Sequence, residues 1–175
     1  MIIRVSSPYN KEVIAMQMKT SVEQSVCAII LLYMLPDKAV LPGEVISQQL
    51  GASPTYFQKI LRKLVRADLI TSVPGVKGGF KLKKKPEEIR IYDIYLAIEG
   101  RQSFYSSSGT LNQMLSINIE ENYCMINDLM GEAEEAWKSV LQRETVASLS
   151  KKVDVNQFRL NIEELQALVN EKMVV

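Results

Sequence analysis

Two helix-forming segments separated by a short turn constrain this chain more than any other feature of its sequence. The first segment runs from Pro42 to Leu50, and Gly51 stands just past its end, where a left-handed C-cap favours glycine. Ser53 and Pro54 then begin the second helix as its N-cap and first helical residue. Two helices joined by so short a turn predict a helix-turn-helix unit.

The second helix of this unit is strongly amphipathic. Its sequence TYFQKILRKLVRADL places apolar and polar residues on opposite faces of a helix. We expect the apolar face to lie in a core and the basic face to meet water or an anionic partner. The apolar face holds Phe57, Ile60, Leu61, Leu64 and Val65, and the other face holds Thr55, Gln58, Lys59, Arg62 and Arg66.

A β-hairpin is predicted directly after the basic helix. A short β-branched strand (LITSV) is followed by a glycine-rich turn (PGVKGG) and a returning strand with alternating lysines (FKLKK). A hairpin in this position is typical of a wing. Two flanking helices complete a winged helix. The first begins with a capping box at Ser21–Gln24 or Thr20–Glu23, and the second covers Ile91 to Ile98. The apolar stripe of the first helix holds Val22, Val26, Ile29, Ile30 and Tyr33.

The C-terminal part is predicted to be a long helix, from about 122 to 148, and a final amphipathic helix. Apolar residues of the long helix recur at heptad spacing over fewer than four heptads, so a dimer seam and packing on the first helix both fit. The stripe holds Ile126, Leu129, Ala133, Ala136, Val140 and Ala147, widened by Met130 and Trp137. The final helix runs through Leu165, Leu168 and Val169, with a capping box at Asn161–Glu164.

Charge is distributed unevenly although the net charge is only +1. Residues 1–100 hold fourteen Lys and Arg against nine Asp and Glu (net +5), and residues 101–175 hold seven against eleven (net −4). Residues 51–85 alone hold nine basic residues and one acid, Asp68 (net +8). This concentration favours a polyanionic partner. The alternative is an ordinary solvated basic face.

Several chemistries are excluded by composition. The chain has no histidine and two cysteines, so it lacks a Ser-His-Asp triad, a Cys-His pair, a histidine metal site and four thiolates for a zinc or iron–sulfur site. The GVKGGF turn lacks the G-K-[ST] ending of a phosphate-binding loop, so no enzyme is expected. The ten-residue apolar run Val26–Leu35 is too short to span a membrane. No leader is visible, so we expect a cytoplasmic protein.

The stretch from Met18 to Gly100 resembles the Rrf-type winged-helix regulators of bacteria, the group that includes IscR, NsrR and CymR. The residues that carry the resemblance are SPTYFQKILRKLVRADLITSVPGVKGGFKL, PEEI and DIYLAIEG. It implies a mainly α fold: a winged helix-turn-helix DNA-binding domain with a two-stranded β wing, and a long C-terminal dimerisation helix. The implied function is that of a homodimeric transcription regulator, usually a repressor, that binds double-stranded DNA at a palindromic operator.

The resemblance divides the chain into an N-terminal extension (1–17), a DNA-binding domain (18–100), a loop (101–121) and a helical dimerisation region (122–175). It also implies DNA contacts from the recognition helix in the major groove and from the wing. Gln58 could pair with adenine, and Arg62 or Lys59 with guanine or phosphate. Each lysine could equally contact phosphate without reading sequence. The matching residues are Ser53, Pro54, Thr55, Tyr56, Gln58, Lys59 and Arg62 in the helix, and Gly75, Lys77, Gly78, Gly79 and Phe80 in the wing.

Departures from the family concern the wing and the sensor. Pro74 stands where relatives often carry an arginine, and Asp68 where glycine is common. A protein-interaction module that reuses a winged helix, with weak non-specific DNA binding, is therefore the alternative function. Cluster-binding members have three cysteines in the loop; here Cys124 matches only the last, so no cluster or other cofactor is expected. Cys124 either packs or senses a redox or small-molecule effector, and Cys27 is expected to be buried.

Overall fold

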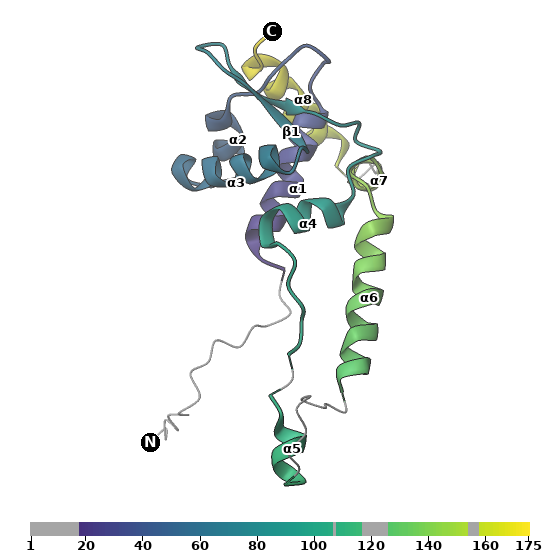
Figure 1. Cartoon of the computed structure of the whole chain (residues 1–175). Helices are drawn as coiled ribbons and strands as arrows, with labels where there is room; N and C mark the ends of the chain where they lie inside the picture. Colours follow the sequence, from purple (N-terminus) through teal and green to yellow (C-terminus); the bar gives the residue numbers. More distant parts are fainter. Residues whose placement is uncertain (1–17, 107, 117–125, 154–157) are drawn as a thin grey trace, which may run out of the picture.

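The computed structural model describes residues 18–106, 108–116, 126–153 and 158–175. Helices dominate, and one two-stranded antiparallel sheet interrupts them between the third and fourth helices (Figure 1). This confirms the predicted mainly α class with its two-stranded wing. The elements are α1 (Thr20–Tyr33), α2 (Gly43–Gln49), α3 (Pro54–Arg66), β1 (Ile70–Val73), β2 (Gly79–Leu82), α4 (Ile91–Glu99), α5 (Thr110–Met114), α6 (Asn127–Arg143), α7 (Val146–Val153) and α8 (Arg159–Lys172).

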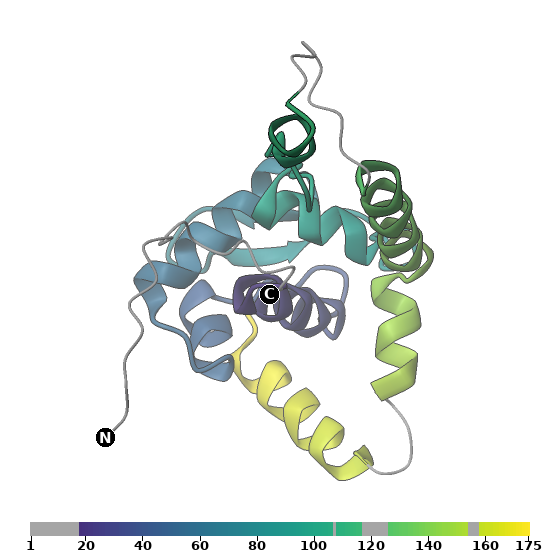
Figure 2. The ribbon, with the colours of Figure 1, turned by 90° about the horizontal axis from the view of Figure 1, so that it is seen from below.

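Helix α1 lies in the middle of the molecule, with other elements around it (Figure 2). It packs against α3, α4, α7 and β2. The predicted single apolar stripe is therefore wrong in part, because Ala28, Leu31 and Leu32 are buried as well while Tyr33 is exposed. A helix covered from several sides buries more than one face, so its sequence shows no narrow stripe.

The start of α1 differs from both predicted capping boxes. Lys19 is the N-cap residue, and no side chain caps the helix. Instead, Lys19 forms an ion pair with the carboxylate of Glu99, and the Ser21 hydroxyl donates to the same carboxylate at 3.5 Å. Because Glu99 is the last residue of α4, these contacts fix the beginning of α1 against the end of α4.

Cys27 is exposed on α1, so the prediction of a buried thiol is wrong. It lies on a part of the helix surface that the packed elements leave uncovered. Partial desolvation, together with the neighbouring carboxylate of Glu23, raises the pKa of the Cys27 thiol. The thiol is therefore protonated at neutral pH and is a poor nucleophile.

The helix-turn-helix forms as the sequence predicts. Gly51 follows α2 with a φ of +60°, the left-handed conformation expected of the C-cap glycine. Ser53 is the N-cap of α3 and Pro54 its first residue, although the Ser53 side chain makes no capping hydrogen bond. Four of the five residues of the predicted apolar face of α3 are buried, and Val65 is half-buried. Phe57, Ile60, Leu61 and Leu64 are each at most 4% exposed.

The wing is anchored at its base by the segment just before α2. Strands β1 and β2 pair from Ile70 opposite Leu82 to Val73 opposite Gly79. Leu41, just before α2, exchanges both backbone hydrogen bonds with Phe80, at 3.0 and 2.9 Å. The hairpin is therefore tied to the helix-turn-helix and is not a free arm.

The C-terminal helices correct the prediction of one helix from 122 to 148. The helix is interrupted at Glu144, whose backbone is extended, and α7 begins at Val146. The break allows pairing with the segment before α4: the Val146 amide donates to the Ile89 carbonyl, and the Ile91 amide to that of Glu144. Ala147, predicted in the long-helix stripe, is instead buried in the core with Val146.

The region predicted as loop 101–121 contains the short helix α5, and Cys124 lies outside the described residues. The last helix, α8, begins at Arg159, so the predicted capping box at Asn161–Glu164 does not form. Beyond α8, Val174 pairs with Val40, and Val169 is fully buried. The end of the chain therefore packs on the winged unit.

Stability is expected to be flat between about pH 5.5 and 8, because no histidine titrates there. Ion pairing and hydrogen bonding lower the pKa values of Asp68, Glu134, Glu144 and Glu171. A lowered carboxylate pKa stabilises the fold above the unfolded value of about 4 and ceases to do so as the pH falls through the folded value. Urea midpoints at several pH values measure this, and a step between pH 6 and 7 would contradict it.

Candidate nucleic-acid interface

The first turn of α3 presents four of the predicted DNA-contacting residues to solvent. Ser53, Pro54, Thr55 and Tyr56 are all exposed, Tyr56 by 43%. The next residue, Phe57, is fully buried and holds this turn on the core. The turn combines an exposed polar surface with a fixed backbone, as contact with base edges requires.

The outer face of α3 offers three unpaired cations. Lys59, Arg62 and Arg66 are exposed, and within the described part of the chain none of them forms a hydrogen bond or an ion pair. Lys63 differs from them, since its ammonium donates to the Ile98 carbonyl at 2.7 Å and so joins α3 to α4. Lys59, Arg62 and Arg66 are thus the cations of this helix that can meet a polyanion without breaking an internal contact, and Lys59 and Arg62 lie nearer the exposed first turn.

Gln58 is less accessible than the sequence predicts. It is half-buried, and its side-chain nitrogen lies only 2.7 Å from where a Cβ on Gly43 would stand. Gly43 is the first residue of α2, so Gln58 packs where the two helices of the helix-turn-helix approach most closely. Because part of the Gln58 side chain is buried in this contact, less of its amide is available to a base than the sequence predicts.

The wing glycines shape the hairpin. A Cβ on Gly78 would lie 2.3 Å from the Val73 carbonyl oxygen, and one on Gly79 would lie 2.6 Å from the Leu41 carbonyl oxygen. Gly79 is buried, whereas Lys77 next to the tip is exposed. Close backbone packing therefore explains both glycines, and of the predicted wing contacts Lys77 has the free side chain.

Two features of the wing were missed in the residue-by-residue prediction. Val76 is fully exposed at the tip, and Lys84 and Lys85 are exposed beyond β2. The lysines contributed to the net charge of residues 51–85, but no motif assigned them a contact.

Figures 1 and 2 place α2 and α3 on one side of the molecule and α6 on the other, and the wing tip extends toward α2 and α3 in Figure 1.

Asp68, the acid of this basic segment, is explained by its backbone. Its φ is +58°, a left-handed conformation that favours glycine, and aspartate is among the residues that tolerate it. Its carboxylate accepts a hydrogen bond from Lys83 at 2.7 Å, which lowers the Asp68 pKa. Lys83 is therefore partly neutralised, unlike Lys84 and Lys85.

Substitution of Gly79 by alanine is expected to destabilise the protein by about 2–3 kcal/mol, because the new methyl group would force the wing away from Leu41. Urea denaturation measures the loss. Gly131→Ala on α6 is the control: no atom would lie within 4 Å of its Cβ, so helix propensity should raise stability by up to about 1 kcal/mol. Equal stability of both variants would contradict this account of the wing.

No described helix combines the length and the apolar character needed to cross a bilayer.

Known proteins resemble the chain over the helices and the wing described above. Residues 18–152 match the family model Rrf2, described as an iron-dependent transcriptional regulator. YwgB of Bacillus subtilis, named as an HTH-type transcriptional regulator, is 41% identical over 138 residues, 79% of this chain and 86% of that protein. YffB of Lactococcus lactis, named likewise, is 32% identical over 89% of this chain and 99% of its own length.

Solved structures share the fold. CymR, named as the global cysteine regulator of B. subtilis, superposes with a TM-score of 0.62 at 22% identity, over 78% of this chain and 97% of that one. IscR of T. potens superposes with a TM-score of 0.61 at 21% identity, over 79% and 89% of the two chains.

The family description names iron, but a [2Fe–2S] cluster does not fit the residues of this chain. It has no histidine and two cysteines, and the described residues hold no group of three or more potential metal ligands. A [2Fe–2S] cluster needs four ligands, and Cys27 lies without a second thiol on α1. The role of Cys124 stays a prediction. In sequence over 18–152, and in the order and packing of its helices and wing, the chain belongs to the Rrf2 family of transcriptional regulators.

Proposed function

We propose that this protein is a homodimeric, sequence-specific transcription repressor that occupies a palindromic DNA operator. The observation that carries the proposal is the exposed surface of α3, where the unpaired Lys59 and Arg62 lie beside the solvent-facing first turn. Lys77 on the wing extends this surface toward an adjacent groove. Because DNA is the partner, the expected compartment is the cytoplasm, and the basic surface would be used for binding rather than catalysis.

The homodimer is supported by the apolar surface of α6. One edge of this helix, with Met130, Trp137 and Leu141, turns toward the molecule, and α6 packs on α4. The heptad stripe instead faces solvent, where Leu129 is 62% and Val140 46% exposed. Apolar residues at this spacing favour a helical partner, and a second copy of α6 would supply a symmetric one.

Binding to genomic DNA tests the proposal directly. Purified protein should retain a small set of genomic fragments that share an inverted repeat, with half-sites about one helical turn apart. Affinity should fall steeply with salt, because phosphate contacts release counterions. Absence of DNA binding at low salt would refute the proposal. Weak, sequence-independent binding together with a stable protein partner would support the interaction module instead, for which Pro74 in the wing is the argument.

A further inference from the structure

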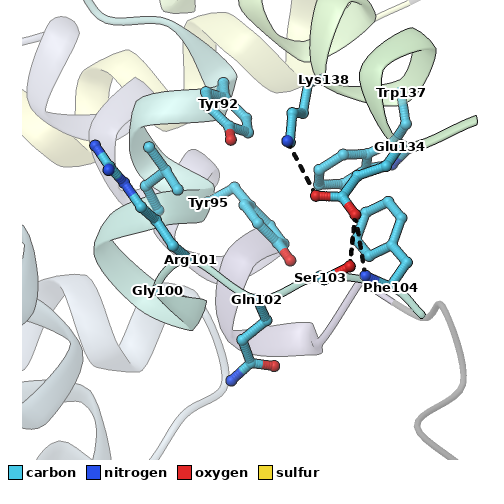
Figure 3. Close-up of a pocket in the computed structure, with 11 residues that line it drawn as sticks. Tyr92, Tyr95, Gly100, Arg101, Gln102, Ser103, Phe104, Glu134, Trp137 and Lys138 are labelled. Atoms are coloured by element: carbon cyan, nitrogen blue, oxygen red, sulfur yellow. Dashed lines mark hydrogen bonds and ion pairs between the residues drawn. The ribbon is translucent and has the colours of Figure 1, made fainter. Parts of the chain in front are cut away.

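A cavity walled by aromatic side chains lies between the DNA-binding unit and α6. Its volume is about 360 Å³, within the range of small-molecule sites. Helix α4 supplies Tyr92 and Tyr95, the segment after it supplies Phe104, and α6 supplies Trp137 (Figure 3). None of the functions proposed above uses this cavity.

The four rings form a connected wall. Trp137 lies edge to face with Tyr95 and with Phe104, both at a centroid distance of 4.7 Å. Tyr92 and Tyr95 are nearly parallel, 6.2 Å apart. All four rings are only half-buried, so they line an open hollow and do not close a core. Such walls suit a flat aromatic ligand, which can stack on one ring and meet the edge of another.

The acid of the cavity is already satisfied. One oxygen of Glu134 pairs with Lys138 at 3.0 Å, and the other accepts hydrogen bonds from the Phe104 amide at 3.2 Å and the Ser103 hydroxyl at 3.0 Å. These contacts lower the Glu134 pKa and hold the segment after α4 against α6. Lys138 pairs with Glu135 as well, at 2.8 Å, so its ammonium lies between two carboxylates and a ligand carboxylate would share it with them. A cationic ligand would compete with Lys138 for Glu134.

The remaining polar side chains of the cavity are mainly donors, beside the amide of Gln102, which both donates and accepts. Among the described residues, the hydroxyls of Tyr92 and Tyr95 and the guanidinium of Arg101 make no hydrogen bond or ion pair. In Figure 3, Tyr92 and Lys138 reach toward the open middle of the cavity from opposite helices. Desolvation raises the pKa of Tyr95, so its hydroxyl stays protonated. Hydroxyl donors and cations beside aromatic walls match a ligand with a ring and an anionic oxygen group.

We propose that this cavity binds an aromatic carboxylate, with its ring among Tyr95, Phe104 and Trp137 and its carboxylate at Tyr92 and Lys138, and that occupancy changes DNA affinity. The second part rests on the proposed function. The route to DNA is short: α6 packs on α4, and the Ile98 carbonyl of α4 accepts a hydrogen bond from Lys63 of α3. A ligand between α4 and α6 therefore acts on the helix that holds both α6 and the recognition helix.

Trp137 provides the test of binding, because it is the only tryptophan of the chain and lines the cavity. Its fluorescence should change saturably with phenylacetate, with a Kd of about 1 mM or tighter. Cyclohexylacetate, which lacks the aromatic ring, and benzyltrimethylammonium, which reverses the charge, should bind at least about tenfold more weakly. No change with phenylacetate, or tighter binding of the cation, would overturn the proposed ligand class.

Variants separate the site from the fold. Tyr92→Phe removes only a hydroxyl, and Lys138→Gln removes the charge that also pairs with Glu134 and Glu135. Each should weaken phenylacetate binding about five- to tenfold. Lys152→Gln is the matched control, since Lys152 pairs with Glu144 outside the cavity. Unchanged affinity in Tyr92→Phe and Lys138→Gln alike would overturn the assigned anchors.

Regulation is measured separately. Saturating phenylacetate should change operator affinity about 5- to 100-fold in the wild type and much less in Lys138→Gln. Binding without any change in operator affinity would overturn the regulatory part. Because the fluorescence titration contains no DNA, its outcome is independent of whether the proposed DNA-binding function holds.

Discussion

Substitution of Arg62 by alanine is expected to weaken operator binding about 10- to 100-fold and to leave the stability of the protein within about 0.5 kcal/mol of wild type. Arg62 is exposed on α3, and no described residue pairs with it, so its truncation removes no internal contact. On DNA, an arginine at this position either binds guanine through two hydrogen bonds or neutralises a phosphate. Fluorescence anisotropy with the mapped operator measures the loss.

The form of the loss decides between base and phosphate contact. If Arg62 binds a base, the variant should tolerate substitution of one operator position that the wild type rejects. If it binds a phosphate, affinity should fall equally on all sequences, and the salt dependence should lose about one counterion. The same two measurements apply to Lys59→Ala, since Lys59 could also contact either a base or a phosphate.

Arg143→Ala is the matched control. Arg143 is an exposed arginine at the end of α6, and α6 lies on the side of the molecule opposite α3 (Figure 1). Its replacement by alanine changes the net charge by the same amount as Arg62→Ala. It should change operator affinity less than about twofold, because separated surface charges are screened. If Arg62→Ala bound the operator as tightly as Arg143→Ala, the assignment of α3 as the recognition helix would be wrong.

The helix-turn-helix could be predicted from sequence because each of its signals is local. Gly51, Ser53 and Pro54 mark the turn, and α3 has water on one side and core on the other, so its burial follows its periodicity. Helix α1 lacks this asymmetry. Neighbours on several sides bury Ser25 and Ala28, which lie outside the predicted stripe, while Tyr33 of that stripe and Cys27 are exposed.

The break between α6 and α7 depends on contacts that lie far away in sequence. Thr145 and Ser148 cap each other reciprocally, at 2.9 and 3.1 Å, and this is a local signal that the heptad pattern concealed. The break itself exists because Ile89 and Ile91 pair with the backbone at 144–146. No periodicity of the segment could reveal that partner.

The interface and the cavity also differ in how far apart in sequence their residues lie. Residues of the interface come from two neighbouring stretches, α3 and the wing, so a basic segment of thirty-five residues identified them together. The cavity joins Tyr92 and Tyr95 to Phe104 and Trp137 across more than forty residues. In sequence, Trp137 is one more apolar residue beside a heptad stripe. Only the packing of α6 on α4 shows that it faces a hollow.

Substitution of Leu129 by glutamate should convert a dimer into a monomer. Leu129 is 62% exposed in the single chain, so glutamate costs little there. In a symmetric α6 seam, the same change would bury two carboxylates close together, which an apolar interface does not tolerate. Light scattering after gel filtration should show the mass of one chain, while the urea midpoint stays near that of the wild type.

Loss of the dimer should reduce operator affinity by at least about 100-fold, because each half-site then binds without the effective concentration that the second copy supplies. Gln142→Glu adds the same charge to an exposed position of α6 that lies off the heptad stripe, and it should leave both mass and affinity unchanged. A Leu129→Glu protein that remains dimeric would place the seam elsewhere. A monomer with full operator affinity would instead show that a single copy reads the DNA, and the proposed palindromic operator would be wrong.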